Sequence, residues 1–387
     1  MRRRSHLIDL GLVASAFITV VLIAGLGCAK KSGSEKILVG SILPLSGEYA
    51  QWGEQERKGI MLGLEALDPE TRNNIEVVFF DHQAQVDRAK DALKQMESRG
   101  IRYCADIMSS DIALSAANYF NEKKILVLSG SNTLGALTKK GGNFFYRVIP
   151  SDALAARGLA KWAAKKGWKR SVVVYSISDW GQGLREELDK SLKATGGVVL
   201  DSLQTKEGAN DFSSVVASVK KNNPEAVYLI TYPREAALIA KELGSVKDGP
   251  VLLGTDNFTN DVLIEASNMQ LDRVYYVVPK QSATQDNPEY KKLTDQYKKA
   301  TGDNNSPPQY LVYGYDLIRI IAQLAKTAGN DTEKARALLD KIEFDGASGK
   351  ISFDENGDLK KEVEYGLMRF SVERDKGKKV VNRIPAE

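Results

Sequence analysis

The sequence predicts an α/β fold with two doubly wound parallel-sheet lobes joined by three crossings of the chain. Short apolar segments rich in β-branched residues alternate with longer amphipathic segments, which is the pattern of repeated βαβ units. The chain has 387 residues, enough for two domains with substantial cores. Polar residues follow several of the apolar segments, and parallel strands would bring those positions to one edge of a sheet.

The individual elements follow from hydrophobic periodicity. The predicted buried strands are residues 37–43, 75–80, 125–128, 171–175, 226–230 and 251–253. The predicted helices between them include residues 87–98, 153–166, 183–194 and 233–243. Because each strand is followed by a helix, we expect parallel sheets.

Breaks in this alternation place the crossings near residues 146–152, 279–282 and 346. We therefore expect a first lobe of residues 37–149 and 280–346, and a second lobe of residues 150–279 and 347–387. The last part of the chain alternates as an antiparallel hairpin would, with strands at 349–353 and 365–370 and a turn at Asn356 and Gly357. We expect this hairpin to close the second lobe.

The N-terminus resembles a lipoprotein export signal. Three arginines, Arg2 to Arg4, precede an uncharged apolar run that ends in small residues before Cys28, although Gly25 stands where such signals usually have Leu. The sequence predicts a signal peptide at 1–27, a lipid anchor on Cys28 and a solvated tether at 28–36. The alternative is an uncleaved membrane anchor, because the apolar run approaches the length that spans a bilayer.

Charge and cysteine content limit the possible partners. The 54 Lys and Arg residues are interleaved with 50 Asp and Glu residues, so no basic surface for nucleic acid is predicted. If Cys28 carries lipid, Cys104 is the remaining cysteine and no intramolecular disulfide can form. Cys104 is expected to be a buried hydrophobic residue, because no activating neighbour is evident.

Enzymatic chemistry has little support in the sequence. The two histidines are His6 in the signal segment and His82 after a strand, so we expect neither a His-based triad nor a multi-His metal site. His82 is expected to be structural. The phosphate-binding P-loop pattern is absent. Residues 354–358 resemble a calcium loop but have Gly at the wrong position, so they predict a turn. We expect no cofactor, no metal and no enzymatic activity.

A candidate ligand site emerges from residues that follow strand-like segments. These residues are Ser110, Ser131, Asn132, Thr133, Tyr232 and Asp256. Hydroxyls and backbone N–H groups suit a carboxylate, a lone carboxylate suits an ammonium, and aromatic rings suit an apolar or cationic body. This combination predicts an α-amino acid ligand. Structural roles remain open: the hydroxyls could cap helices, Asp256 could form an Asx turn, and the aromatic residues could be core residues.

A family resemblance covers almost the whole chain after the signal. The matching motifs are LPLSG at 43–47, QWG at 51–53, FDHQ at 80–83, SS at 109–110, SNT at 131–133, WGQG at 180–183 and GKISFD at 349–354. In order and spacing the chain resembles type I periplasmic solute-binding proteins of the branched-chain amino-acid (Leu/Ile/Val) group. The resemblance implies a ligand held between two closing lobes and handed to an ABC permease.

The resemblance also implies roles for individual residues. Ser110, at a helix start, matches a residue that receives the ligand carboxylate, and Ser131 and Thr133 match the loop that binds carboxylate and ammonium. Asp256 matches the acidic residue that pairs with the ammonium from the second lobe. The matching aromatic residues are Tyr232 and Trp180 from the second lobe and Trp52 and Tyr310 in the walls of the side-chain pocket.

Three departures from the family pattern concern the ligand. Asn132 stands where the family usually has Ala, Asp106 replaces Gly, and Trp180 is bulkier than the usual Tyr. A polar, aromatic or amide-bearing ligand therefore stands beside Leu, Ile and Val. Asp106 could alternatively be a buried partner for a hinge group.

The expected function is that of an extracytoplasmic, membrane-anchored receptor, acting as a monomer, that captures an amino acid and delivers it to an ABC importer. One alternative is a ligand sensor for a signalling partner. The other is a binding protein for a different solute, such as an amide, urea or an aromatic acid, which would not need Asp256.

Overall fold

The computed structural model describes residues 36–386, apart from residues 245, 247, 269, 281–285, 361–362 and 376–377. The predicted signal peptide, Cys28 and nearly all of the predicted tether lie outside the described residues. Within the described part of the chain, no helix combines the length and the apolar character needed to cross a membrane.

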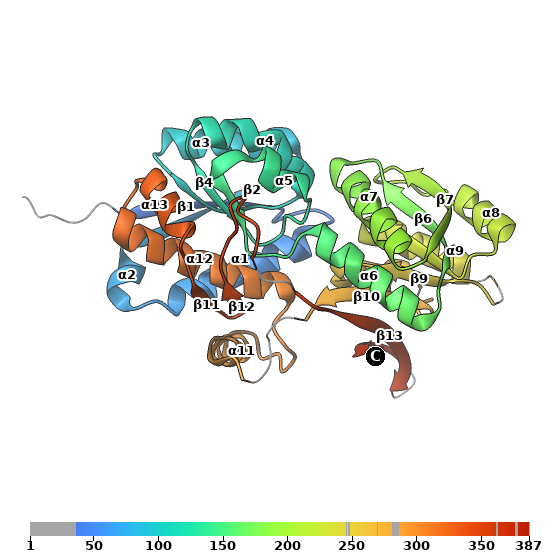
Figure 1. The fold of residues 1–387 in the computed structure, drawn as a ribbon. Helices are drawn as coiled ribbons and strands as arrows, with labels where there is room; N and C mark the ends of the chain where they lie inside the picture. Colours follow the sequence, from blue (N-terminus) through green and yellow to red (C-terminus); the bar gives the residue numbers. More distant parts are fainter. Residues whose placement is uncertain are drawn as a thin grey trace, which may run out of the picture. The chain divides into compact units, whose positions relative to one another are not determined.

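The first sheet is parallel throughout, with the strand order β2-β1-β3-β4-β5. Its strands are β1 (Ile37–Leu43), β2 (Ile75–Asp81), β3 (Tyr103–Ile107), β4 (Leu126–Ser129) and β5 (Phe145–Arg147). Helices α3 (Val86–Ser98) and α4 (Ser110–Glu122) cover one face, and α1 (Ala50–Glu65) and α12 (Gln309–Ala328) cover the other (Figure 1). This arrangement confirms the predicted βαβ units.

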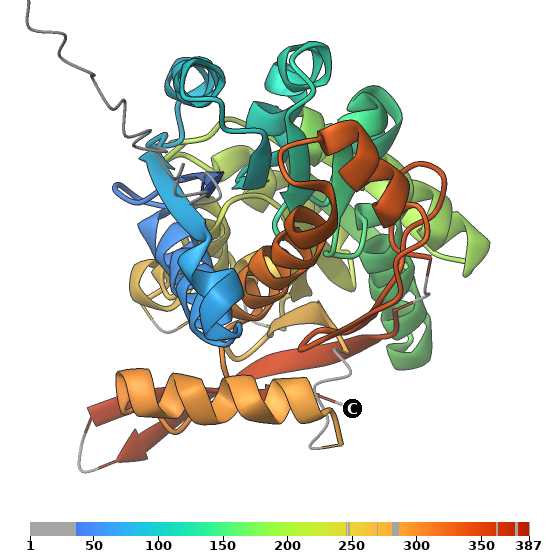
Figure 2. The same ribbon diagram turned by 90° about the vertical axis from the view of Figure 1, so that its left-hand side faces the viewer.

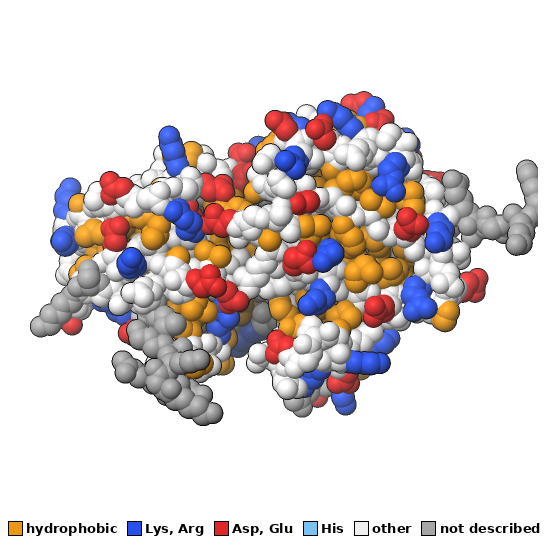
Figure 3. All heavy atoms as spheres, turned by 180° about the vertical axis from the view of Figure 1, so that it is seen from behind, with side chains coloured by type: hydrophobic (Ala, Val, Ile, Leu, Met, Phe, Trp, Pro, Cys, Tyr) orange, Lys and Arg blue, Asp and Glu red, His pale blue; other side chains and the backbone are white. Residues whose placement is uncertain are grey.

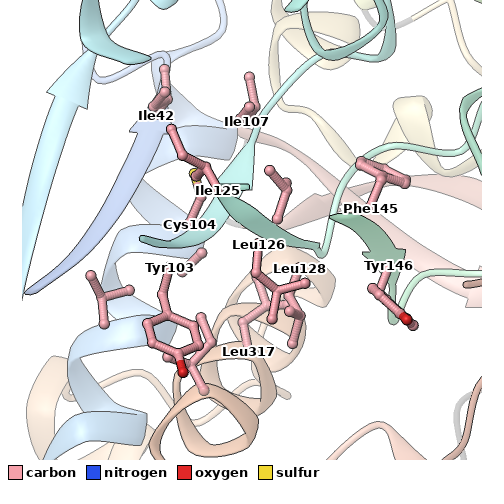
Figure 4. Packing of buried hydrophobic residues seen from close by; sticks show 14 of the residues in the cluster. Ile42, Tyr103, Cys104, Ile107, Ile125, Leu126, Leu128, Phe145, Tyr146 and Leu317 are labelled. Atoms are coloured by element: carbon pink, nitrogen blue, oxygen red, sulfur yellow. The ribbon is translucent and has the colours of Figure 1, made fainter. Parts of the chain in front are cut away.

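The core of the first lobe forms around the central strands. Figure 4 shows Tyr103 and Leu126 beside Leu317 of α12, with Cys104 on the other face of the sheet, and all four are fully buried. Burial raises the pKa of the Cys104 thiol well above its usual value. Cys104 is therefore a core residue, as expected, and the reactive thiolate is disfavoured.

The second sheet has the strand order β14-β13-β10-β9-β8-β6-β7, parallel from β10 to β7 and antiparallel at β13 and β14. Its strands are β6 (Arg170–Ser176), β7 (Val198–Thr205), β8 (Ala226–Ile230), β9 (Val251–Gly254), β10 (Val274–Pro279), β13 (Tyr365–Asp375) and β14 (Lys378–Pro385). Helices α6 (Asp152–Lys166) and α7 (Asp179–Ala194) pack on one face, while α8 (Ser213–Asn222) and α9 (Pro233–Gly244) pack on the other. The chain passes between the sheets after β5 and after β10, as predicted, and again just before β13, later than the predicted crossing near residue 346.

The remaining described elements are short or peripheral. They are the helices α2 (Pro69–Asn73), α5 (Ala136–Lys140), α10 (Val262–Ala266), α11 (Pro288–Thr301) and α13 (Thr332–Leu339), the 3-10 helices η1 (Gly142–Phe144) and η2 (Asp256–Thr259), and the strands β11 (Phe344–Gly346) and β12 (Gly349–Ile351). On the face shown in Figure 3, Lys and Arg are interspersed with Asp and Glu, so this face has no extended basic stripe.

The predicted C-terminal hairpin is wrong in its pairing. Strand β12 pairs with β11 instead, and β13 pairs with β14 and β10. A tight turn does form, with Gly357 at φ +85°. It connects Phe353 and Leu359, which form an isolated antiparallel bridge, and does not connect the two predicted strands. Ile351 and Phe353 are buried in the first core, so residues 347–359 pack on the first lobe. We had expected them on the second lobe, and this part of the predicted boundary is wrong.

Glycines allow α1 and α12 to approach closely. A Cβ added at Gly59 of α1 would lie 2.0 Å from the carbonyl oxygen of Leu311, and one at Gly314 of α12 would lie 2.4 Å from that of Glu56. Figure 2 shows the two helices side by side beneath the first sheet. Because backbone atoms cannot move aside as side chains do, the helix spacing depends on these glycines.

We predict that Gly59→Ala lowers the free energy of unfolding by about 1–3 kcal/mol, because the new methyl forces α1 and α12 apart. Urea unfolding followed by circular dichroism measures the change. The matched control is Gly135→Ala, where the added methyl meets no atom within 4 Å and the φ angle is −62°. An equal stability of the two variants would contradict this account of the helix pair.

Candidate functional site

A cavity of about 410 Å³ lies where the strand ends of the two lobes meet; we call it the cleft. The predicted ligand residues that line it are Trp52, Ser110, Ser131, Thr133, Trp180, Tyr232, Asp256 and Tyr310. Its volume falls within the range of about 300–1,000 Å³ that small-molecule sites occupy. The structure thus brings together residues that are far apart in the sequence, while their role in binding stays a prediction.

The helix α4 begins at the cleft, directly after β3. Ser110 is its first residue, and the Ser110 Oγ accepts a hydrogen bond from the backbone N–H of Leu134 at 3.3 Å. Ser109, the residue before the helix, has a φ of +86°, which turns the chain sharply from the strand into the helix. The start of α4, with its partial positive charge, is therefore available to an anionic group.

The loop after β4 is held rigidly behind Ser131 and Thr133. The Ser129 Oγ accepts a hydrogen bond from the N–H of Asn132 at 3.0 Å. The buried Arg147 donates from Nη1 to the carbonyl oxygens of Asn132, at 3.2 Å, and of Leu134, at 2.8 Å. This loop therefore presents its groups to the cleft in one fixed conformation.

Asn132 does not line the cleft, contrary to the prediction. Its side chain is fully buried, and Nδ2 donates to Asp106 Oδ1 at 3.1 Å and to the carbonyl oxygen of Ile107 at 2.8 Å. Asn132 and Asp106 therefore form one buried polar cluster beneath the loop. The two departures from the family pattern compensate each other, because a buried carboxyl group needs hydrogen-bond donors.

A second carboxyl group completes this buried cluster. Glu56 of α1 and Asp106 are both fully buried, and Asp106 also accepts hydrogen bonds from the N–H groups of Ile107 and Gly130 at 2.8 and 3.1 Å. Burial, and then the charge of Asp106, raises the pKa of Glu56 well above its usual value. Because two buried neighbouring carboxylates repel each other, we infer that Glu56 is protonated and donates to Asp106.

The second lobe contributes Asp256, the first residue of η2 after β9. Its Oδ2 accepts a hydrogen bond from Gln309 Nε2 at 3.1 Å, and burial raises its pKa to about 6. No Lys or Arg is among the described residues that line the cleft. The Asp256 carboxylate thus lacks an ionic partner there and would be stabilised by a cationic group of a ligand.

Aromatic rings from both lobes form a continuous wall. The ring centroids of Tyr49 and Trp52 lie 5.6 Å apart, those of Tyr49 and Tyr232 lie 5.2 Å apart, and those of Trp180 and Tyr232 lie 5.5 Å apart. Tyr310 extends the wall, with its ring 5.9 Å from that of Trp52. The wall offers apolar edges and electron-rich faces to a ligand side chain.

Sequence reasoning missed several polar residues of the cleft, among them Tyr49, Glu207 and Asp111. Tyr49 donates a hydrogen bond from its hydroxyl to Glu207 Oε1 at 2.5 Å, and Asp111 Oδ1 accepts one from the N–H of Trp180 at 3.2 Å. Both bonds join the two lobes. Glu207 follows the end of β7, and Asp111 follows Ser110, so the strand-end rule that found the other residues could have found these two.

His82 also lines the cleft, but it serves the fold. It is 1% exposed, and its Nδ1 accepts a hydrogen bond from the N–H of Ala84 at 3.0 Å. Burial lowers its pKa to about 4, so it is neutral at pH 7. In the described part of the chain, no group of three His, Cys, Asp or Glu residues is arranged to hold a metal ion.

Comparison with known proteins places these features in a family. A family model described as periplasmic binding protein matches residues 36–374. Among curated proteins, the leucine-, isoleucine-, valine-, threonine- and alanine-binding protein of Pseudomonas aeruginosa is 22% identical over 322 residues, covering 82% of this chain and 85% of that protein.

Solved structures show the same fold. The branched-chain amino acid transporter substrate-binding protein of Streptococcus pneumoniae, in complex with isoleucine, has 20% identity and a TM-score of 0.75, covering 90% of this chain and 99% of the other. An ABC transporter solute-binding protein from R. palustris, in complex with benzoate, has 20% identity and a TM-score of 0.74, covering 89% and 95%.

We predict that Glu56→Gln reduces the pH dependence of stability. The folded protein holds a proton on Glu56 that the unfolded chain releases above about pH 4.5. The stability from this proton is therefore complete below pH 4.5 and is lost as the pH rises through the raised pKa, by up to about 1.4 kcal/mol per pH unit. Gln keeps a donor toward Asp106 without titrating.

The measurement is urea unfolding of the parent and the variant between pH 5 and pH 9. Glu65→Gln, at an exposed position of the same helix, is the control and should follow the parent curve. If the parent and Glu56→Gln lost stability equally with rising pH, the protonated carboxyl pair would be refuted.

Proposed function

Because the chain belongs to the periplasmic binding protein family, we propose that it captures an amino acid between its lobes and delivers it to an ABC importer. This family consists of solute-binding proteins and not of enzymes, and it acts outside the cytoplasm. The observation that carries the proposal is the division of the cleft, with hydroxyls and a helix start on the first lobe and the Asp256 carboxylate on the second.

This division suits a zwitterion. Ser110, Ser131 and Thr133 would receive the ligand carboxylate, helped by the start of α4, while Asp256 would receive the ammonium. A ligand that carries both charges bridges the two lobes and favours their closed arrangement. Micromolar affinity needs only about −8 kcal/mol, which a few charge-assisted hydrogen bonds and one buried side chain supply.

The ligands for which the similar proteins are named support two candidate cargoes. The Pseudomonas relative is named for five small or aliphatic amino acids, and the Streptococcus structure contains isoleucine. The benzoate complex supports the aromatic-acid alternative, for which the aromatic wall of the cleft would be suitable. Asp256 favours an amino acid, because it would repel a carboxylate that has no ammonium beside it.

We predict that Asp256→Asn weakens amino-acid binding about 10-fold to 100-fold, since a charge-assisted hydrogen bond contributes about 1.5–3 kcal/mol. Isothermal titration calorimetry measures the dissociation constant, after a thermal-shift screen of the twenty amino acids, urea, amides and benzoate has identified the ligand. The control is Asp295→Asn, at an exposed position of α11, which should bind like the parent.

If benzoate binds both the parent and Asp256→Asn, and no amino acid binds the parent, then the cargo is an aromatic acid and not an amino acid. An amino acid that binds both forms equally would show that its ammonium lies elsewhere. The proposed roles of the remaining residues of the cleft would then need a different ligand orientation.

We further propose that Cys28 carries a lipid after cleavage of residues 1–27 and that the protein acts as a monomer. The support for the anchor is the sequence pattern before Cys28, and the support for a monomer is that one chain supplies both sides of the cleft. One acyl chain holds a protein only marginally in a membrane, so stable anchoring requires a multiply acylated cysteine.

Mass spectrometry of the membrane fraction is expected to find Cys28 acylated at the new N-terminus. Cys28→Ser should abolish acylation, whereas Cys104→Ala, which changes a buried core residue, should leave it intact. An unmodified Cys28 with the apolar segment still attached would instead indicate an uncleaved anchor.

A further inference from the structure

The cleft contains more negative charge than a neutral amino acid can balance. Asp111, Asp179, Glu207 and Asp256 line it, and the described lining residues include no Lys or Arg. We propose that the ligand carries a second cationic group on its side chain, held between Glu207, Asp111 and the aromatic wall. This inference rests on the proposed function, because it assumes that an amino acid occupies the cleft.

The charges can be assigned group by group. An amino acid would place its carboxylate at Ser110 and the start of α4, and its ammonium at Asp256, as proposed above. Asp111 is partly satisfied by the start of α7, through the N–H of Trp180 at 3.2 Å. Glu207 receives only the neutral hydroxyl of Tyr49, at 2.5 Å. The cleft therefore retains net negative charge after a zwitterion has bound.

No Lys or Arg is among the described residues that line the cleft, and two arginines of the lobes are held by other groups. The Arg147 guanidinium is fully buried behind the loop and is bound to Asp358 and to two carbonyl oxygens. Arg234, on the second lobe, is directed to Asn210 and to the carbonyl oxygen of Ala209. His82 is neutral, because burial lowers its pKa to about 4. Asp179 and Glu207 are exposed to solvent at the cleft, and a cationic group of a ligand could replace that solvent around them.

The aromatic wall supplies the second requirement of a cation site. Tyr232 lies at its centre, 5.2 Å from the Tyr49 ring and 5.5 Å from the Trp180 ring. The faces of Trp and Tyr rings attract ammonium and guanidinium groups, most strongly where water is excluded. Trp180 is 7% exposed, whereas Tyr49 and Tyr232 are partly exposed, so the Trp180 end of the wall is the part most shielded from water.

Carboxylates beside aromatic faces form a site for a primary ammonium, a guanidinium or a methylated ammonium, each of which is a cation with apolar flanks. A purely aliphatic side chain would leave Glu207 and Asp111 without a counter-charge. An acidic or aromatic-acid ligand would add to the repulsion. The structure thus selects basic amino acids over aliphatic ones.

The test uses the full-length protein in detergent and two pairs of ligands that differ mainly in charge. Arginine is compared with citrulline, and lysine with norleucine, by calorimetry at low and at moderate salt. At least one cationic ligand is expected to bind about tenfold or more tightly than its neutral counterpart, with a preference that weakens as salt increases.

Two variants locate the effect. Glu207→Gln and Asp111→Asn should each reduce the ratio of cationic to neutral affinity, whereas Asp295→Asn should leave this ratio unchanged. A variant that only disturbs the structure would weaken the binding of the cationic ligand and of its neutral counterpart alike. An unchanged ratio of the two affinities would therefore contradict the assignment of these residues.

The outcomes separate the two proposals. Tight binding of leucine or norleucine, with no preference for lysine or arginine, would overturn the second cationic group and leave the amino-acid receptor intact. Failure of every amino acid to bind, together with binding of benzoate or urea, would overturn both.

Discussion

The buried guanidinium of Arg147 is the constraint on which the rest of the site depends. Arg147 is fully buried at the end of β5, where it pairs with Asp358 and donates to the carbonyl oxygens of Asn132 and Leu134. A buried charge that loses its partner costs about 3–5 kcal/mol, so the loop, the strand and the turn around Gly357 must keep their positions together. These hydrogen bonds hold the loop that presents Ser131 and Thr133 to the cleft.

The polar cluster of Glu56, Asp106 and Asn132 supports the same loop from the other side. Asp106 has a φ of +71° and accepts hydrogen bonds from Asn132 and from the N–H groups of Ile107 and Gly130, which links the ends of β3 and β4. The proton on Glu56 removes the repulsion that two carboxylates would otherwise produce.

Around the cleft, the described contacts between the lobes are hydrogen bonds and the aromatic contact of Tyr49 with Tyr232. Tyr49 bonds to Glu207, Asp111 to the backbone of Trp180, and Gln51 to Asp261 at 2.9 Å. Interfaces of this kind allow domains to move, whereas a large apolar interface would hold them together. A ligand that bridges the two charged sides can therefore shift the equilibrium between separated and closed lobes, which is the physical basis of capture.

The sequence by itself determined the alternation of strands and helices, the two lobes, and the position of Ser110, Thr133 and Asp256 at strand ends, because hydrophobic periodicity and strand direction are local properties. Only the tertiary structure decided that the Asn132 side chain points into the core toward Asp106, that β12 pairs with β11, and that Glu207 meets Tyr49. Each of these outcomes depends on which distant segment packs against the residue. The orientation of a loop side chain and the choice of a pairing partner follow from contacts between remote parts of the chain, which no local pattern encodes.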